Sequence, residues 1–309
     1  MNDVLDGHAL LRHGRTIARP SRVVVLGAGG FIGKALVSRL SAQEIPVVAP
    51  SRSEFDLAAP DSVGTLVDQL RPDDTLVFAS ASTPEKGRDA ATFMRNITMG
   101  YHVGSAVERR PCAHVVYLSS VAVYGQSPDT QVSERTPPDP DDLYGVMHLT
   151  REKLLRCVLA ATRVPLAVLR LSNVYGTGDS HASYGPNRFM REIEQRGCLT
   201  LFGAGEELRD HVYVDDVVGV ILSTIARRSE GLVNVATGRS VSFATIADIF
   251  DQVVGEPVPR ATRARSVPLM HLHYDVTLLR QAFPELVWTS MADGVARVVA
   301  ARKAMCGRA

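Results

Sequence analysis

The chain has 309 residues, of which 45% are hydrophobic and 22% are charged. This is an ordinary globular composition, which excludes collagen-like repeats, coiled coils and intrinsic disorder. The 34 Lys and Arg residues nearly balance the 33 Asp and Glu residues, so the basic excess typical of nucleic-acid-binding proteins is missing. No apolar run reaches the roughly 18–20 residues that span a bilayer. We therefore expect neither a nucleic acid nor a membrane as partner.

The first 20 residues are polar and lack the apolar stretch of a secretory signal. We interpret residues 1–20 as a short extension before the fold. The four cysteines form no CxxC pair and no cluster with His at zinc-ligand spacing. We expect them to be reduced thiols in a cytoplasmic protein without a metal site.

From residue 22 onward, short apolar runs alternate with segments of helical periodicity. The expected strands are 22–26, 47–49, 76–79, 115–118 and 166–171. The expected helices are 31–40, 61–70, 90–109 and 143–161. Apolar strands alternating with helices predict a parallel, doubly wound sheet covered on both faces, a Rossmann-like α/β fold.

After residue 171 the pattern loosens. Residues 176–186 are rich in Gly, Ser, Pro and Asn and are expected to form a loop, and 255–267 is expected to be an exposed connection. Short elements are expected at 199–202, 211–214, 216–225, 233–236, 242–254 and 291–302. We assign 21–172 and 211–240 to the Rossmann domain, and 173–210 and 241–309 to a smaller C-terminal substrate-binding lobe.

A glycine pattern follows the first strand of this fold directly. Gly27 permits a tight turn, Gly30 lets the backbone approach a pyrophosphate, and Gly33 lets the next helix pack closely on the strand. The helix N-terminus, at Phe31 and Ile32, offers free N–H groups to phosphates. The strand before the glycines and the helix after them are the context that confirms a dinucleotide-binding turn.

The end of the second strand distinguishes NAD from NADP. An acidic residue there binds the ribose 2′-hydroxyl, whereas an Arg accommodates a 2′-phosphate. The strand end has Ser51 and Arg52 and no acid, which favours NADP, with NAD as the other possibility. Asp56 and Leu57 are expected to line the adenine.

Several motifs follow in a fixed order along the chain. They are LSSVAVYG at 118–125, ERTP at 134–137, Tyr144-Gly145, RLSNVYG at 170–176, FGAG at 202–205, Arg209-Asp210, YVDDV at 213–217 and NVATG at 234–238. Together with the glycine turn, this order resembles the extended short-chain dehydrogenase/reductase family, in its NAD(P)-dependent nucleotide-sugar epimerase, dehydratase and reductase group. The resemblance covers nearly the whole chain.

The resemblance implies roles for three residues of the reaction centre. Tyr144 would exchange a proton with the sugar oxygen, and Ser120 would hydrogen-bond the same oxygen. His148 stands four residues after Tyr144, where the family has Lys. A His is shorter and only partly charged at neutral pH. Either His148 replaces Lys, with a different pH profile, or catalysis is weakened or lost. We favour retained activity because Tyr144 and Ser120 are both present.

The resemblance also implies binding residues. Further cofactor contacts are expected from Ala79, Ser80, Ala81 and Asn96, in addition to Tyr144 and His148. Arg209 would bind the substrate diphosphate, because a guanidinium can bind phosphate bidentately. Asn173 would contact the diphosphate or the sugar, and Arg188 is a weaker candidate. A homodimer built on helices 90–109 and 143–161 is expected by analogy.

The residues after Ser120 narrow the reaction. Members that dehydrate sugar nucleotides usually have an Asp-Glu pair there, and this chain has Val121 and Ala122. Neither residue performs acid–base chemistry, so 4-keto reduction and 4-epimerisation remain. The missing acid after the second strand favours reduction of an NDP-(deoxy)hexose. Two competing hypotheses are a reductase of carbonyl compounds that carry no nucleotide and a catalytically silent dinucleotide-binding protein.

Overall fold

The structure, a computed structural model, describes residues 4–5, 8–125, 131–179 and 185–306. Its centre is a six-stranded sheet, in the order β11-β7-β6-β5-β3-β4, with every neighbouring pair parallel. The strands are β3 (Arg22–Leu26), β4 (Val47–Val48), β5 (Asp74–Phe78), β6 (His114–Ser120), β7 (Leu166–Leu171) and β11 (Gly231–Val235). The predicted Rossmann-like sheet is confirmed.

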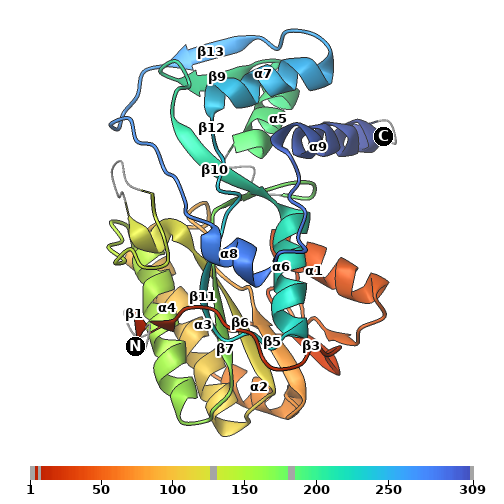
Figure 1. The fold of residues 1–309 in the computed structure, drawn as a ribbon, viewed down its shortest axis with the longest axis vertical. Helices are drawn as coiled ribbons and strands as arrows, with labels where there is room; N and C mark the ends of the chain where they lie inside the picture. Colours follow the sequence, from red (N-terminus) through yellow and green to blue (C-terminus); the bar gives the residue numbers. More distant parts are fainter. Residues whose placement is uncertain (1–3, 6–7, 126–130, 180–184, 307–309) are drawn as a thin grey trace.

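Helices cover both faces of this sheet (Figure 1). One face packs on α1 (Phe31–Ala42), α6 (Val214–Ala226) and α8 (Thr277–Ala282), and the other packs on α2 (Ser62–Gln69), α3 (Ala90–Arg109) and α4 (Leu143–Ala160). Successive strand residues enter opposite cores: Val23 and Val25 face the first set of helices, and Val24 faces the second. Because both faces are buried, the strands appear in the sequence as continuous apolar runs.

The strand order reverses next to β3. The chain passes from β3 to its neighbour β4 on one side, and from β5 onward the strands are added on the other side. The connections after β3 and β5 therefore diverge and leave a crevice at the carboxyl ends of these strands, which is where doubly wound sheets bind ligands. Gly27 and Ala79, which follow these two strands, lie at this crevice.

A smaller lobe lies beyond the carboxyl edge of the sheet, at the top of Figure 1. It consists of α5 (Gly185–Arg196), β9 (Leu199–Phe202), α7 (Phe243–Val254), β13 (Arg260–Arg263) and α9 (Met291–Cys306) around an apolar core. A three-stranded sheet of β12 (Ser240–Ser242), β10 (Leu208–Tyr213) and β8 (Asn173–Tyr175) is added to these elements.

Two predictions about this region need correction. The expected connection 255–267 contains β13, which pairs in parallel with β9. All four β13 residues are exposed and they have no apolar alternation, so the sequence contained no strand signal there. The expected loop 176–186 ends at α5, which begins at Gly185, and its residues 180–184 lie outside the described part of the chain.

The N-terminal segment is held against the open side of β11. Leu11 N donates to Leu232 O at 2.9 Å, and Glu230 N donates to Arg12 O at 2.8 Å. The His13 ring contacts the Ser229 hydroxyl and the Ala282 carbonyl. Short strands β1 (Val4–Leu5) and β2 (His8–Ala9) precede this contact. Residues 11–14 and 18 are therefore hydrogen-bonded to the Rossmann domain. Among the described residues, no helix combines the length and apolarity needed to cross a membrane.

Candidate active site

A cavity of about 400 Å³ opens at the carboxyl edge of the sheet and extends to the lobe. It brings together most of the residues predicted to bind cofactor and substrate. Those on its lining are Gly27, Gly30, Phe31, Ile32, Gly33, Ala79, Ala81, Ser120, Tyr144, His148, Asn173 and Arg209. A pocket of this size, lined by both apolar and polar residues, is typical of small-molecule sites.

The glycine turn forms the floor of this cavity at the start of α1. Gly27 has a φ of +95°, and a Cβ on Gly33 would lie 2.1 Å from Gly27 O. Only glycine allows this turn and this approach of the helix. Gly30, the N-cap of α1, provides no side-chain cap, so the first N–H groups of the helix are available to an anion.

The structure distinguishes the two serines at the end of β6. The Ser119 hydroxyl donates to Glu152 Oε1, and Glu152 also forms a buried ion pair with Arg170 at 2.7 Å. Ser120 instead begins the 3-10 turn η1 (Val121–Tyr124), and its Oγ accepts from Ala122 N at 3.1 Å. Ser119 therefore serves the core, and Ser120 is the better candidate for contact with a substrate.

Tyr144 is placed by the first turn of α4. Asp142 caps this helix, since its Oδ1 accepts from Gly145 N at 2.8 Å. Gly145 lies directly against η1, where a Cβ would be 2.4 Å from Ala122 O. This close approach brings the start of α4 next to the turn that begins at Ser120, so both residues line the same cavity.

His148 lies one helical turn after Tyr144, and its ring meets the Tyr144 ring edge-on at 4.6 Å between centroids. The imidazole is buried, and its Nδ1 is 2.8 Å from the Tyr117 hydroxyl. Burial, reinforced by the nearby charge of Arg151, holds the pKa of His148 well below its ordinary value. The expectation of a partly charged side chain at neutral pH was therefore wrong, because desolvation keeps the ring neutral.

An acidic residue that was not predicted lies in the turn after β4. The Glu54 carboxylate accepts from both Ser51 N, at 2.8 Å, and Ser51 Oγ, at 2.7 Å. These hydrogen bonds lower the pKa of Glu54. Arg52 is exposed and forms only a loose pair with Asp56 at 3.9 Å. Glu54 stands three residues beyond the expected position, and only the turn of the backbone brings it back to Ser51.

Other residues predicted to bind the cofactor form contacts within the protein and do not line the main cavity. Asp56 pairs with Arg95 at 2.7 Å, which lowers the pKa of that carboxyl, and Leu57 is buried in the core. The Asn96 amide bonds the backbone of Ser82 on both its N–H and its carbonyl. The Ser80 carbonyl accepts from Arg151. None of Ser51, Arg52, Asp56, Leu57, Ser80 and Asn96 is on the described lining of the main cavity.

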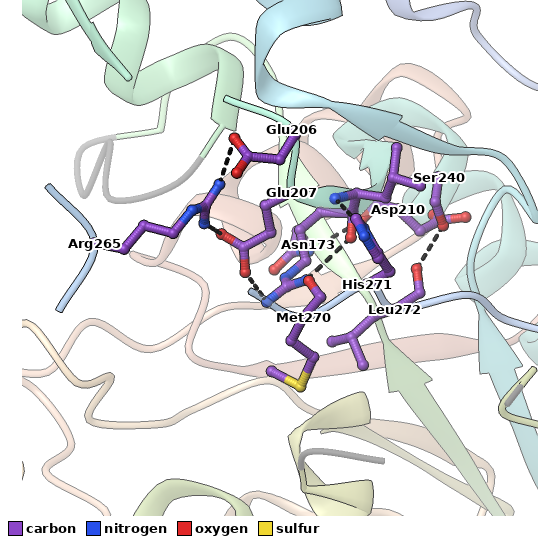
Figure 2. Close-up of polar contacts among 11 residues, drawn as sticks. Asn173, Glu206, Glu207, Asp210, Ser240, Arg265, Met270, His271 and Leu272 are labelled. Carbon is purple, nitrogen blue, oxygen red and sulfur yellow. Dashed lines mark hydrogen bonds and ion pairs between the residues drawn. The ribbon is translucent and has the colours of Figure 1, made fainter. Parts of the chain in front are cut away.

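Arg209 reaches the cavity from β10 and belongs to a network of charges. Figure 2 shows Glu206, Glu207 and Arg265 of this network. The Arg209 guanidinium pairs with the Glu207 carboxylate. Arg265 pairs with the same carboxylate at 3.4 Å and with Glu206 at 2.9 Å. Asn173, on β8, donates to the Asp210 carbonyl at 3.0 Å. Arg265 was not predicted as a site residue, because its segment has neither helical nor strand periodicity.

Arg188 does not reach the described lining of the cavity. Its guanidinium lies over the rings of Phe189, Phe202 and Phe243, and it donates to Thr200 O at 3.0 Å. This arrangement stabilises the lobe core. The cavity is also lined by Lys86, Arg88 and Tyr274, which lie in irregular segments and were not predicted as site residues.

Known proteins resemble this chain over most of its length. A dTDP-L-rhamnose 4-epimerase from Burkholderia thailandensis is 26% identical over 86% of this chain and 90% of its own. A dTDP-6-deoxy-L-talose 4-dehydrogenase (NAD(P)(+)) from Kitasatospora kifunensis is 30% identical over 77% of this chain and 80% of its own. RMD from Pseudomonas aeruginosa, solved with NADPH, has the same fold, with a TM-score of 0.82 at 22% identity over 92% of this chain and 99% of its own.

The family model for the NAD dependent epimerase/dehydratase family matches residues 23–236. That span includes the glycine turn, Ser120, Tyr144 and Arg209, and it covers more than half of the chain. The chain belongs to the NAD dependent epimerase/dehydratase family, within the extended short-chain dehydrogenase/reductases, and is an enzyme of its nucleotide-sugar group.

Proposed function

We propose that this enzyme reduces the 4-keto group of a nucleotide-activated hexose or deoxyhexose with NADPH. Tyr144 is the proton donor and Ser120 holds the keto oxygen. The observation that carries the proposal is the cavity that Ser120 and Tyr144 line together with the glycine turn. We place reduction before epimerisation because a reductase needs Tyr144 only as a proton donor, whereas an epimerase also needs it as a base in its oxidation half-reaction.

The residues of the cavity fit a dinucleotide. The turn at Gly27, Gly30 and Gly33 is so tight that a Cβ on Gly27 or Gly33 would collide with backbone atoms, and the uncapped start of α1 follows it. The N-terminus of a helix stabilises the pyrophosphate of a dinucleotide by its free N–H groups and its partial positive charge. The nicotinamide group, when bound, supplies the hydride for the reduction.

The chain's own residues would then handle the oxygen and its proton. Ser120 donates a hydrogen bond to the keto oxygen and stabilises the negative charge that develops on it. Tyr144 transfers its phenolic proton to that oxygen, which becomes the 4-hydroxyl, and Tyr144 is left as a phenolate until water reprotonates it. Val121 and Ala122, which also line the cavity, provide no second acid or base, which argues against dehydration.

Arg209 supports a substrate with a diphosphate. Its guanidinium reaches the cavity on the lobe side and is held there by Glu207. The dTDP-L-rhamnose 4-epimerase and the dTDP-6-deoxy-L-talose 4-dehydrogenase are both named for a reaction at carbon 4 of a dTDP-sugar. These names agree with the proposed reaction at C4 and do not decide between reduction and epimerisation.

The proposal is tested by mixing the enzyme with NADPH and a dTDP-4-keto-6-deoxyhexose and following the loss of absorbance of NADPH. We expect stoichiometric oxidation of NADPH and formation of the 4-hydroxy sugar, both abolished in Tyr144→Phe. Interconversion of C4 epimers without net consumption of NADPH would show that the enzyme is the epimerase instead.

One observation favours NAD as the cofactor in place of NADP. Glu54 occupies both Ser51 donors, and its negative charge would repel a 2′-phosphate. We retain NADP because the exposed Arg52 side chain forms a loose ion pair with Asp56 and is able to turn toward a phosphate. Comparing the dissociation constants of NADPH and NADH for the wild-type protein decides between the two cofactors.

A further inference from the structure

A fully buried arginine lies behind the cavity, one turn after His148 on α4. The Arg151 side chain is completely inaccessible, and its stem fits against Gly100 of α3, where a Cβ would be 2.9 Å from Arg151 Cγ. Its guanidinium donates to Asn96 O at 2.8 and 2.6 Å and to Ser80 O at 2.8 Å. These bonds fix the position of the positive charge under the connection that follows β5.

The charge of the same guanidinium acts on the Tyr117 phenol of β6. Tyr117 is fully buried between Phe78, His148 and Arg151. Burial raises the pKa of Tyr117 far above its ordinary value, so the phenol keeps its proton. The Tyr117 hydroxyl lies 2.8 Å from His148 Nδ1. A buried phenol proton needs an acceptor, so this proton is directed to His148 Nδ1.

This direction of hydrogen bonding determines the tautomer of His148. A neutral imidazole has one donor and one acceptor nitrogen. With Nδ1 accepting from Tyr117 at 2.8 Å, the ring proton must be on Nε2. Among the described residues Nε2 has no hydrogen-bond partner, although it is buried and His148 lines the cavity. A buried donor without a partner is costly unless a ligand satisfies it.

We propose that Arg151 and Tyr117 are positioning residues that hold His148 as a neutral Nε2–H donor toward the nicotinamide ribose. The inference rests on the proposed function for the identity of the ligand. Two residues act together in this arrangement. His148 gives the hydrogen bond, and Arg151 gives the fixed positive charge.

The charge of Arg151 also acts on Tyr144. The guanidinium and a Tyr144 phenolate attract each other, which favours the phenolate that remains after proton donation. The other titratable or charged groups that line the two pockets around Tyr144 are His148, Glu85, Lys86, Arg88, Asp89, Asp142, Asp179, Arg209 and Tyr274, and Tyr117 lies behind His148. Arg151 differs from these cations because it is completely buried, where charge interactions are screened least.

The tautomer can be tested in the protein alone. Proton–nitrogen correlation spectra distinguish protonated from unprotonated imidazole nitrogens, and His148→Gln identifies the signal among the nine histidines. We expect wild-type His148 to be neutral, with the proton on Nε2, from about pH 6 to pH 8. Tyr117→Phe should produce a mixture of tautomers. A His148 that becomes cationic within this range, or keeps its tautomer in Tyr117→Phe, refutes the proposal.

Binding and turnover then test the consequences. In Tyr117→Phe we expect the dissociation constant of the reduced cofactor to rise about three- to tenfold, as when one hydrogen bond is lost. In Arg151→Gln we expect the apparent pKa that Tyr144 gives to the pH dependence of kcat to rise by on the order of one pH unit. In Arg151→Lys this apparent pKa should stay close to the wild-type value. The matched control is Lys153→Gln, which removes an exposed positive charge from the same helix.

A purely structural role would lower thermal stability in Tyr117→Phe and Arg151→Gln and leave the tautomer, the cofactor affinity and the apparent pKa of Tyr144 unchanged. That result overturns the proposal. If the enzyme turns over no 4-keto sugar, the spectra and the cofactor affinities still decide whether Arg151 and Tyr117 position His148. Failure of the proposed function is thus distinguishable from failure of this inference.

Discussion

Replacing Gly145 by alanine tests whether the approach of α4 to η1 sets the distance between Tyr144 and Ser120. The added Cβ would lie 2.4 Å from Ala122 O and 2.7 Å from Pro140 Cβ, whereas ordinary contacts begin near 3.4 Å. The two elements must therefore separate by about 1 Å, and a misplacement of this size costs about 100-fold in rate. Overpacking costs about 1–3 kcal/mol of stability, which a typical domain survives.

The assay compares kcat for the 4-keto sugar with the dissociation constant of the cofactor. We expect Gly145→Ala to lower kcat about 100-fold and to leave cofactor affinity within a few-fold. The matched control is Gly64→Ala in α2, where nothing lies within 4 Å of the new Cβ. It should stabilise the helix by roughly 0.8–1 kcal/mol without loss of rate. A folded Gly145→Ala variant with wild-type kcat would refute the reasoning.

Three further predictions concern the proton donor, the cofactor and acid stability. Tyr144→Phe should lower kcat by about 100-fold or more with unchanged cofactor affinity; substantial residual turnover, measured with saturating cofactor, would remove it from the mechanism. Arg52→Ala should weaken NADPH binding more than NADH binding. Glu54→Gln should strengthen NADPH binding more than NADH binding, because it removes the anion that repels the 2′-phosphate. Equal effects on the two cofactors in fluorescence titrations contradict this prediction. Burial lowers the pKa values of His114 and His211 to about 4. Between about pH 6.5 and pH 4 the unfolded chain therefore binds more protons than the folded protein. The free energy of unfolding in urea should fall as pH falls through this range, by at most roughly 3 kcal/mol per histidine. His114→Gln should make this dependence on pH less steep.

The sequence predicted the sheet and the glycine turn because each follows from local sterics and burial. Strands buried on both faces are mostly apolar, as in residues 23–26 of β3 and 166–169 of β7. The turn at Gly27 requires a positive φ and a close helix, and only glycine meets both conditions. Such features are visible without knowledge of any long-range contact.

The remaining features depend on contacts between distant segments. Tyr117 and His148 are 31 residues apart, and neither residue type alone indicates that the other is its partner. Glu54 was overlooked because it reaches Ser51 through a turn of the backbone that no strand or helix pattern reveals. The neutrality of His148 is a consequence of burial, and burial on α4 depends on how α3 and β6 pack against it.

The hydrogen bonds between the N-terminal segment and β11 have a consequence for aggregation. An uncovered outer strand is a template on which a strand of another molecule can add. At the opposite border of the sheet, β4 has only two residues and offers little to pair with. Removing residues 1–20 would expose the Leu232 carbonyl and the Glu230 amide, which residues 11 and 12 now satisfy. The shortened protein should therefore self-associate increasingly with concentration, while the cavity at the carboxyl ends of the strands keeps its shape.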